Sequence, residues 1–218
     1  MQGNFSESLR NGKVASFLSR ENWVKPLSDF AKAADIPVFL FTSQGTNILR
    51  CLGDRPFINY IQENAPWFPG SKGFQFEQEL IAQVVVSGKP ASKSIAVSLY
   101  LYGYPIILEK QVIGVIMMGW IPHRFCDPYT CDRIAEYLGL AKDQLWQVMR
   151  RETPVSLQRS QLFENLLATL MDHTLANIVQ EQRYEVEKKT ASAVNRKNNC
   201  YYQVAILGRY RKCYSRRV

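Results

Sequence analysis

The sequence predicts an α+β domain, in which a mostly antiparallel sheet of about five strands is flanked by helices and followed by a long C-terminal helix. Three patterns lead to this prediction. Apolar and polar residues alternate over 94–102, two apolar runs at 104–109 and 112–121 flank a short turn, and apolar residues recur at helical spacing after Ser156 with no glycine or proline until Gly208. The 218 residues are 46% hydrophobic and 21% charged, a globular composition that excludes a wholly disordered chain.

The N-terminal part predicts an arm, a helix and a hairpin. Residues 1–22 are polar and indicate a flexible arm. From Trp23, apolar residues follow the i, i+3, i+4, i+7 pattern of one helical face, and Pro37 ends this helix. Residues 36–42 are a short apolar run closed by Ser-Gln-Gly, so we expect a strand whose hairpin partner is 48–52.

The segment 54–73 contains three prolines and two glycines and predicts a loop with a short helix near 57–61. Loops of this length inside a domain often form binding lids. Residues 76–85 then carry a helical apolar face, which Gly88 and Pro90 end. We therefore expect a lid and a helix ahead of the main part of the sheet.

Three helices are predicted after the sheet. Asp127 and Pro128 supply an N-cap and a first-turn proline to a helix that runs to Gly139. A second, short helix stops before Pro154. The third begins at Ser156, and its apolar face fades beyond residue 179 into a charged segment. We expect this last helix to project beyond the domain.

The basic charge is confined to the end of the chain. The sequence has 27 basic and 19 acidic residues, a net charge of +8. Residues 195–218 hold seven basic residues and no acidic one, so the remainder carries 8 − 7 = +1. We expect four parts: a flexible arm (1–22), a globular domain (23–155), a long helix (156–190) and a basic, disordered tail (191–218).

Cysteine content and apolar run length indicate the compartment. Five cysteines are an odd, sparse set for this length, which favours reduced thiols over a disulfide scaffold. The longest apolar run, Val112–Ile121, has ten residues, half of the roughly 20 that a membrane-spanning helix needs. The first residues include neither a basic leader nor an apolar stretch. We expect a cytoplasmic protein.

The order of these elements resembles a known family. The chain contains, in this order, a hairpin, a helix ending in Gly-Lys-Pro (88–90), a strand, the segment Tyr104–Trp120, a Leu-Gly-Leu and a long helix. Within this series, residues 112–119 match an apolar strand of the pattern G-V-x-x-x-G. Over Trp23–Gln180 the chain resembles the PocR-type sensory domain, a relative of the PAS and GAF ligand-binding folds. The resemblance implies a PAS/GAF-like sheet and a C-terminal signalling helix that forms homodimers.

The resemblance also implies a function. Domains of this family usually sit upstream of a kinase, cyclase or DNA-binding output and report a small metabolite such as a short diol. Members commonly carry a Cys in the loop before the central helix and a Cys-His pair in the following strand. Here the loop reads Trp67–Gly73 without cysteine and the strand positions are Ile95 and Ala96, so we expect no cofactor and no metal at these positions.

A sensor of this class needs a cavity with apolar walls and a few polar groups that orient the ligand. Candidates are the large side chains of the predicted strands and lid, each of which has plain core packing as its alternative. The mixed strand face with Ser98 is favoured, provided that its register points it at the cavity. The predicted ligand-binding residues are Phe39, Phe41, Trp67, Tyr100, Tyr102, Tyr104, Met118 and Trp120.

Catalytic and metal sites are not predicted. His123, Cys126 and Cys131 are grouped after the last strand, but a closed zinc site needs four ligands and a fourth is not apparent nearby. Phosphate-binding, nucleophile-elbow and zinc-protease motifs do not occur in the sequence. His173 lies on the long helix without a kinase segment after it. We therefore expect a binding module rather than an enzyme.

The sequence thus predicts the small-molecule sensory domain of a bacterial signal-transduction protein, such as a two-component system, or of a transcription regulator. Ligand binding would be transmitted through the C-terminal helix of a homodimer to an output domain that is supplied separately or lost. The alternative is a dimerisation or interaction module whose basic, tyrosine-containing tail binds nucleic acid.

Overall fold

The computed structural model describes the chain outside residues 1–13, 52, 54, 65–68 and 215–218, and describes side chains up to residue 188 except 62 and 186. It divides into two compact units, Met1–Thr174 and Leu175–Val218. The first unit holds one antiparallel sheet with strand order β2-β1-β5-β4-β3. The strands are β1 (Val38–Thr42), β2 (Asn47–Cys51), β3 (Ala91–Ile95), β4 (Leu99–Leu108) and β5 (Gln111–Pro122).

The predicted fold class is confirmed, because five antiparallel strands are flanked by helices and a long helix closes the chain. Ser71 and Asp127 cap their helices by accepting hydrogen bonds from Phe74 N and Thr130 N, at 3.3 Å and 2.7 Å. The helices are α2 (Arg20–Ala34), α3 (Pro56–Asn64), α4 (Lys72–Ser87), α5 (Pro128–Leu138), α6 (Lys142–Met149) and α7 (Leu157–Tyr214). None of the helices in the described part of the chain has the length and apolar character of a membrane span.

Both predicted hairpins form, but the alternating segment 94–102 is not one strand. It is split by a turn between β3 and β4, closed by a hydrogen bond from Ser98 N to Ile95 O at 3.1 Å. Ala96 and Val97 occupy the turn with φ of 52° and 53°. Hairpin turns that need two positive φ values normally carry Asn or Gly. The sequence has neither here, which is why the turn was not predicted.

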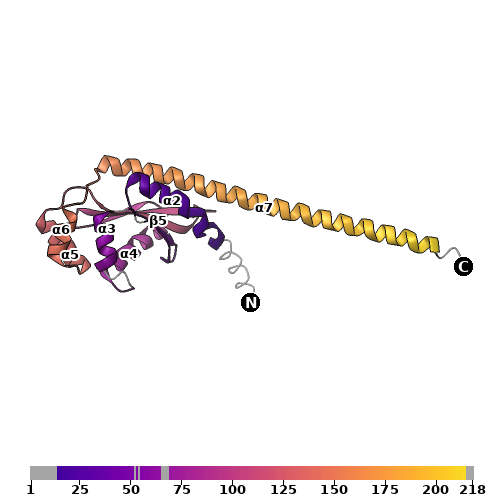
Figure 1. Cartoon of the computed structure of the whole chain (residues 1–218), viewed down its shortest axis with the longest axis horizontal. Coiled ribbons are helices and arrows are strands. Elements are labelled where there is room, and N and C mark those ends of the chain that lie inside the picture. Colours follow the sequence, from indigo (N-terminus) through magenta and orange to yellow (C-terminus); the bar gives the residue numbers. More distant parts are fainter. Residues whose placement is uncertain (1–13, 52, 54, 65–68, 215–218) are drawn as a thin grey trace. The chain divides into compact units, whose positions relative to one another are not determined.

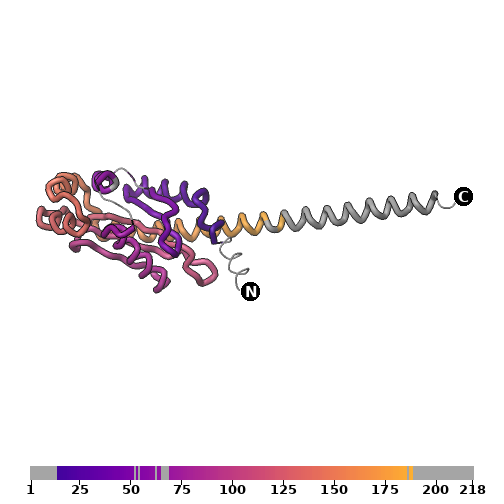
Figure 2. The backbone as a smooth tube through the Cα atoms, turned by 90° about the horizontal axis from the view of Figure 1, so that it is seen from below, coloured from indigo at the N-terminus to yellow at the C-terminus, as the bar shows by residue number. Residues whose placement is uncertain are grey.

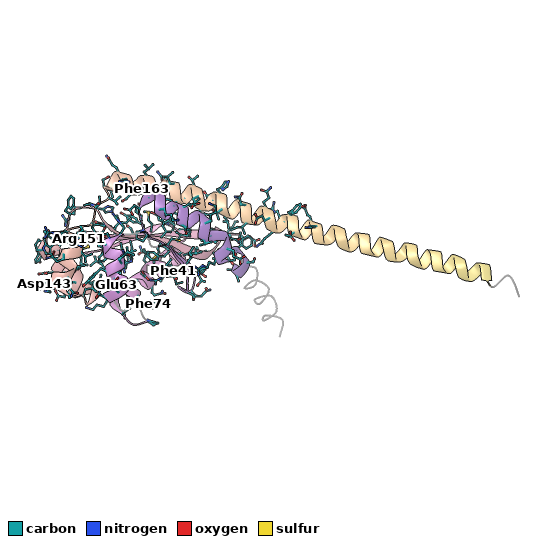
Figure 3. All side chains as sticks on the ribbon, viewed as in Figure 1. Phe41, Glu63, Phe74, Asp143, Arg151 and Phe163 are labelled. Carbon is teal, nitrogen blue, oxygen red and sulfur yellow. The ribbon has the colours of Figure 1, made fainter. Side chains whose placement is uncertain are left out.

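The sheet packs helices on both faces (Figure 1). Because alternate residues of a strand point to opposite faces, each strand contributes to both layers. On the face that we call the α4 face, Phe39, Leu101 and Met117 join α3, α4, α5 and α6 in the main core. On the opposite α2/α7 face, α2 and the first turns of α7, where Figure 3 labels Phe163, cover the sheet. Phe30 of α2 meets Phe163 edge-on, with 6.4 Å between the ring centroids.

A glycine sets how closely α4 approaches the sheet. A Cβ atom on Gly103 of β4 would lie 2.9 Å from Val84 Cγ2 and 3.3 Å from Leu80 Cγ. Leu80 and Val84 are fully buried. At one end of the domain α5 and α6 pack together and α6 packs against α3 (Figure 2). The α4 face is therefore densely filled along α4.

Two expected segments differ from the structure, and a third agrees with it. Residues 14–17 of the predicted arm are helical, α2 begins at Arg20 rather than Trp23, and Phe17 and Leu18 are buried. The short helix expected near 57–61 is confirmed as α3. Helix α7 runs to Tyr214 and so includes most of the predicted tail. No proline interrupts the sequence after Pro154, and this allows the helix to continue. The side chains from residue 189 onward lie outside those described.

Candidate functional site

The predicted ligand-binding residues do not form one site, because the sheet separates them. Phe39 pairs with Met117 and points to the α4 face, as does Phe41. Met118 pairs with both Val38 and Tyr102, which places it on the α2/α7 face. The residues on that second face are Tyr100, Tyr102, Tyr104 and Met118. Trp67 lies outside the described residues.

Trp120 belongs to the α4 face through a bulge. Tyr100 pairs with Ile121 and Leu101 with Gly119, so Trp120 is the extra residue of β5 and has a φ of 60°. Its ring lies 6.3 Å from that of Phe57 on α3 and 5.9 Å from that of Phe76 on α4. Trp120 is 2% exposed. The bulge thus turns a large side chain inward, between α3 and α4.

A buried carboxyl group lies at the same face. Glu77 of α4 is 1% exposed, and Arg50 of β2 approaches its Oε2 at 3.9 Å. The Arg50 guanidinium also lies over the Phe39 ring, 5.6 Å from its centroid. A carboxyl group buried in an otherwise apolar core is the kind of polar group that orients a ligand in an apolar pocket.

On the α2/α7 face, His123 connects the sheet to the start of α7. The Tyr102 hydroxyl lies 2.5 Å from His123 Nε2, and His123 Nδ1 lies 2.7 Å from the Val155 carbonyl. A carbonyl only accepts, so Nδ1 carries the proton and, in the neutral ring, Nε2 accepts from Tyr102. The Ser160 hydroxyl lies 3.5 Å from the same Nδ1. The His123 ring therefore connects β4 and β5 to Val155, just before α7, and to Ser160 in the first turn of α7.

Tyr104 and Glu164 lie next to His123, Tyr102 and Ser160, and we call these five residues the His123 cluster. Burial raises the pKa of Tyr102 to about 12 and raises that of Tyr104 further above its ordinary value, and the carboxyl group of Glu164 adds to both shifts. Burial also raises the pKa of Glu164, against the opposing effects of the Tyr104 hydroxyl and His123. The tyrosine hydroxyls thus stay neutral and face one carboxyl group of α7.

A buried ion pair ties the start of α3 to the segment before α7. Arg55 is 4% exposed and its Nε lies 3.3 Å from Glu152 Oε2, whose side chain is 2% exposed. Arg55 Nη2 donates to Thr153 O at 2.6 Å, and Phe57 N donates to Glu152 Oε1 at 2.6 Å. Burial raises the pKa of Glu152, although Phe57 N–H and Arg55 oppose the shift. Removing one partner would leave an uncompensated buried charge.

His123 does not converge with the two cysteines after β5. His123 bonds to Tyr102 and Val155, whereas Cys126 Sγ lies 3.2 Å from Ser98 Oγ. Within the described residues, no group of three or more histidine, cysteine, aspartate or glutamate side chains is placed to hold a metal ion.

Sequence reasoning missed the residues that join the layers. Arg55 and Glu152 are far apart in sequence, and neither belongs to a motif. Ser160 and Glu164 lie one turn apart on α7, on the side that meets His123 and Tyr104. The available signal was that Ser160 and Glu164 are polar residues spaced i, i+4 among apolar ones. A polar pair on the buried side of a helix indicates that a buried polar partner faces it.

Comparisons with known proteins add little to this geometry. No family model matches the chain, and no curated protein matches it. Among solved structures, the crystal structure of the GAF domain/HD domain protein from Geobacter sulfurreducens is similar, with 10% sequence identity and a TM-score of 0.36. The match covers 78% of this chain and 97% of that chain.

Proposed function

We propose that this chain is a small-molecule sensory module of a bacterial signal-transduction or transcription-regulatory protein, and that it acts by binding rather than catalysis. The observation that carries the proposal is the double connection to the start of α7. Arg55 holds residues 152 and 153, while His123 holds Val155 and Ser160. Both connections lie within the first compact unit.

The ligand region is the part of the α4 face that lies beneath α3, where the Trp120 ring contacts that of Phe57. There Phe39, Phe41 and Trp120 supply apolar contacts, and Glu77 supplies an orienting carboxyl group. A ligand that displaces Trp120 from between Phe57 and Phe76 moves α3, to whose first turn Arg55 is joined. Because a ligand shifts an equilibrium only by its differential affinity for two states, these contacts must differ between the free and bound forms.

The residues of the α2/α7 face then have a different role from the one predicted. Tyr100, Tyr102, Tyr104 and Met118 lie against α2 and α7 rather than beneath α3. We assign Tyr102 and Tyr104, together with His123, to transmission between the sheet and α7. A change in the bulge at Trp120 reaches this cluster along β5, because His123 directly follows that strand.

The output is passed on through α7, which we propose pairs with a second copy of the chain. Leu157, Leu162 and Leu166 are 59%, 55% and 51% exposed on the first turns of α7. Leu162 and Leu166 are spaced i, i+4, so they share one side of the helix, away from buried Phe163 and Leu167. α7 would pass the change to an output domain such as a kinase, cyclase or DNA-binding domain.

Thermal denaturation of the full chain with short diols, organic acids and other small metabolites tests ligand binding. We expect at least one class to raise the melting temperature in a saturable manner. Glu77→Gln should weaken the shift, whereas Glu79→Gln, on the exposed side of the same helix, should leave it unchanged. If no compound raises the melting temperature, or if the two variants behave alike, the ligand region is wrongly assigned.

Hydrogen–deuterium exchange tests transmission separately. Ligand should change the protection of amides at residues 152–160 in the native chain. In His123→Ala the ligand should still bind but the change at 152–160 should shrink, because the link to Val155 is lost. Light scattering tests pairing, for which Leu162→Ser/Leu166→Ser should dissociate the dimer and Asn165→Ser, exposed on the same helix, should not.

A further inference from the structure

The start of α5 holds two cysteines at positions that face each other. Asp127 is the N-cap of α5, which makes Cys126 the residue before the cap and Cys131 the fourth residue of the helix. In a hydrophobic staple, apolar side chains at these two positions pack together and fix the direction from which the chain enters the helix. Here both members of the staple are thiols, which we call the thiol pair.

The two thiols differ in exposure and in protonation. Cys126 is 6% exposed and Cys131 is fully buried. A hydrogen bond between the two thiols, supported by the Ser98 hydroxyl at 3.2 Å, lowers the pKa of Cys126 to about 7. The same contact and burial raise the pKa of Cys131. The more accessible sulfur is therefore the better nucleophile, and a protonated thiol lies against it.

We propose that the thiol pair is a redox modification site, which a hydroperoxide closes into a disulfide. The Cys126 thiolate attacks one peroxide oxygen, the O–O bond breaks, and the leaving oxygen takes a proton as water or an alcohol. Cys126 is then a sulfenic acid. The Cys131 sulfur attacks it, the S–S bond forms, the S–O bond breaks, and the hydroxide leaves with the Cys131 proton as water.

The pair is suited to this reaction because it needs no remote rearrangement. Both cysteines belong to one local motif, and Cys131 N already donates to Asp127 O at 3.0 Å in the first turn of α5. Closure replaces the Ser98–Cys126 hydrogen bond, which joins α5 to the turn before β4. Cys126 and Cys131 belong to the same core as Trp120, but their oxidation requires no ligand at the proposed small-molecule site.

Mass spectrometry of the full chain tests the proposal directly. Both thiols lie in one expected tryptic peptide, Phe125–Arg133, so an internal disulfide makes this single peptide lighter by two hydrogen atoms. With a few equivalents of hydrogen peroxide at neutral pH, we expect this species to form and dithiothreitol to reverse it. At a pKa of about 7, Cys126 should react roughly threefold to fourfold faster at pH 7 than an ordinary thiol of pKa about 8.5, because its larger thiolate fraction outweighs its lower intrinsic nucleophilicity.

Cys51 supplies the internal control. It is also buried and also contacts a serine hydroxyl, that of Ser28 at 3.4 Å. It should remain reduced while the thiol pair oxidises. In Cys131→Ser, oxidation should stop at a sulfenic acid that a cyclic 1,3-diketone traps at Cys126, and Cys126→Ser should protect Cys131.

Two results would overturn the proposal. One is loss of the Cys51 thiol as fast as that of Cys126, which would show that the staple confers no reactivity. The other is over-oxidation of Cys126 to a sulfinic acid with no lighter peptide, which would show that Cys131 does not reach it. In either case the thiol pair serves only as apolar packing.

Discussion

Replacing Gly103 by alanine tests how closely α4 packs on the sheet, which decides how full the α4 face is. The new Cβ would lie 2.9 Å from Val84 Cγ2, closer than two carbon atoms can pack. The valine methyl cannot swing away freely, because its branched Cβ restricts it. Either Val84 leaves its rotamer or α4 moves outward.

The expected size follows from two opposing effects. Alanine should stabilise a strand position by about 0.5–1 kcal/mol relative to glycine, because the unfolded chain loses less entropy. Overpacking a filled core costs about 1–3 kcal/mol. We therefore expect Gly103→Ala to lower the free energy of unfolding by about 1–2 kcal/mol, measured by urea denaturation followed by tryptophan fluorescence.

Val84→Ala removes the clashing methyl and so identifies the cause. Alone it should destabilise the domain, since Val84 is fully buried. Combined with Gly103→Ala it should cost about 1–2 kcal/mol less than the sum of the single changes. Val85→Ala, at the neighbouring and only partly buried position, should instead be additive with Gly103→Ala. A Gly103→Ala variant more stable than the native chain, or additivity with Val84→Ala, would refute the close packing.

Three other changes test further parts of the structure. Val97→Gly should stabilise the domain by about 1 kcal/mol in urea denaturation, because a β-branched residue at positive φ is strained, and an unchanged midpoint would contradict the turn. Arg55→Met should lower the free energy of unfolding by about 3–5 kcal/mol, because it leaves the Glu152 charge buried without its partner. The double change Arg55→Met/Glu152→Leu should lower it by much less than the sum of the two single changes. A loss equal to that sum would mean that the pair is not buried. The folded-state pKa of Tyr102 is raised from 10 to about 12, so the stability that its neutral hydroxyl provides is fully present below pH 10 and is lost as pH rises to about 12. In Tyr102→Phe, the free energy of unfolding should therefore fall less steeply between pH 10 and 12 than in the native chain. An equal slope in the two proteins would show that the Tyr102 hydroxyl is not buried.

The caps and hairpins that depend on neighbouring residues were predictable. Asp127 with Pro128, and Gly139, mark the ends of α5 as expected. The turn at Ala96 and Val97 was not, because neither residue prefers positive φ and tertiary packing of the flanking strands imposes it. Its insertion ends β3 early and makes residues 99–108 one continuous strand.

The candidate site was predicted less well than the fold, for a reason visible in the tyrosines. Their alternation showed that Tyr100, Tyr102 and Tyr104 share one face of a strand, but a strand pattern does not say which helices cover that face. The structure places α2 and α7 there, so these residues meet His123 and Glu164 rather than the side that carries Trp120.

The sequence by itself determined the periodicities and caps that specify an antiparallel sheet, its flanking helices and a long last helix, because these patterns depend on residues close together in the chain. Tertiary structure alone decided that Arg55 meets Glu152, that His123 meets Val155, and that Trp120 turns inward through a bulge. Such contacts arise where distant segments are brought together to bury apolar area and to pair buried polar groups. No local pattern records them.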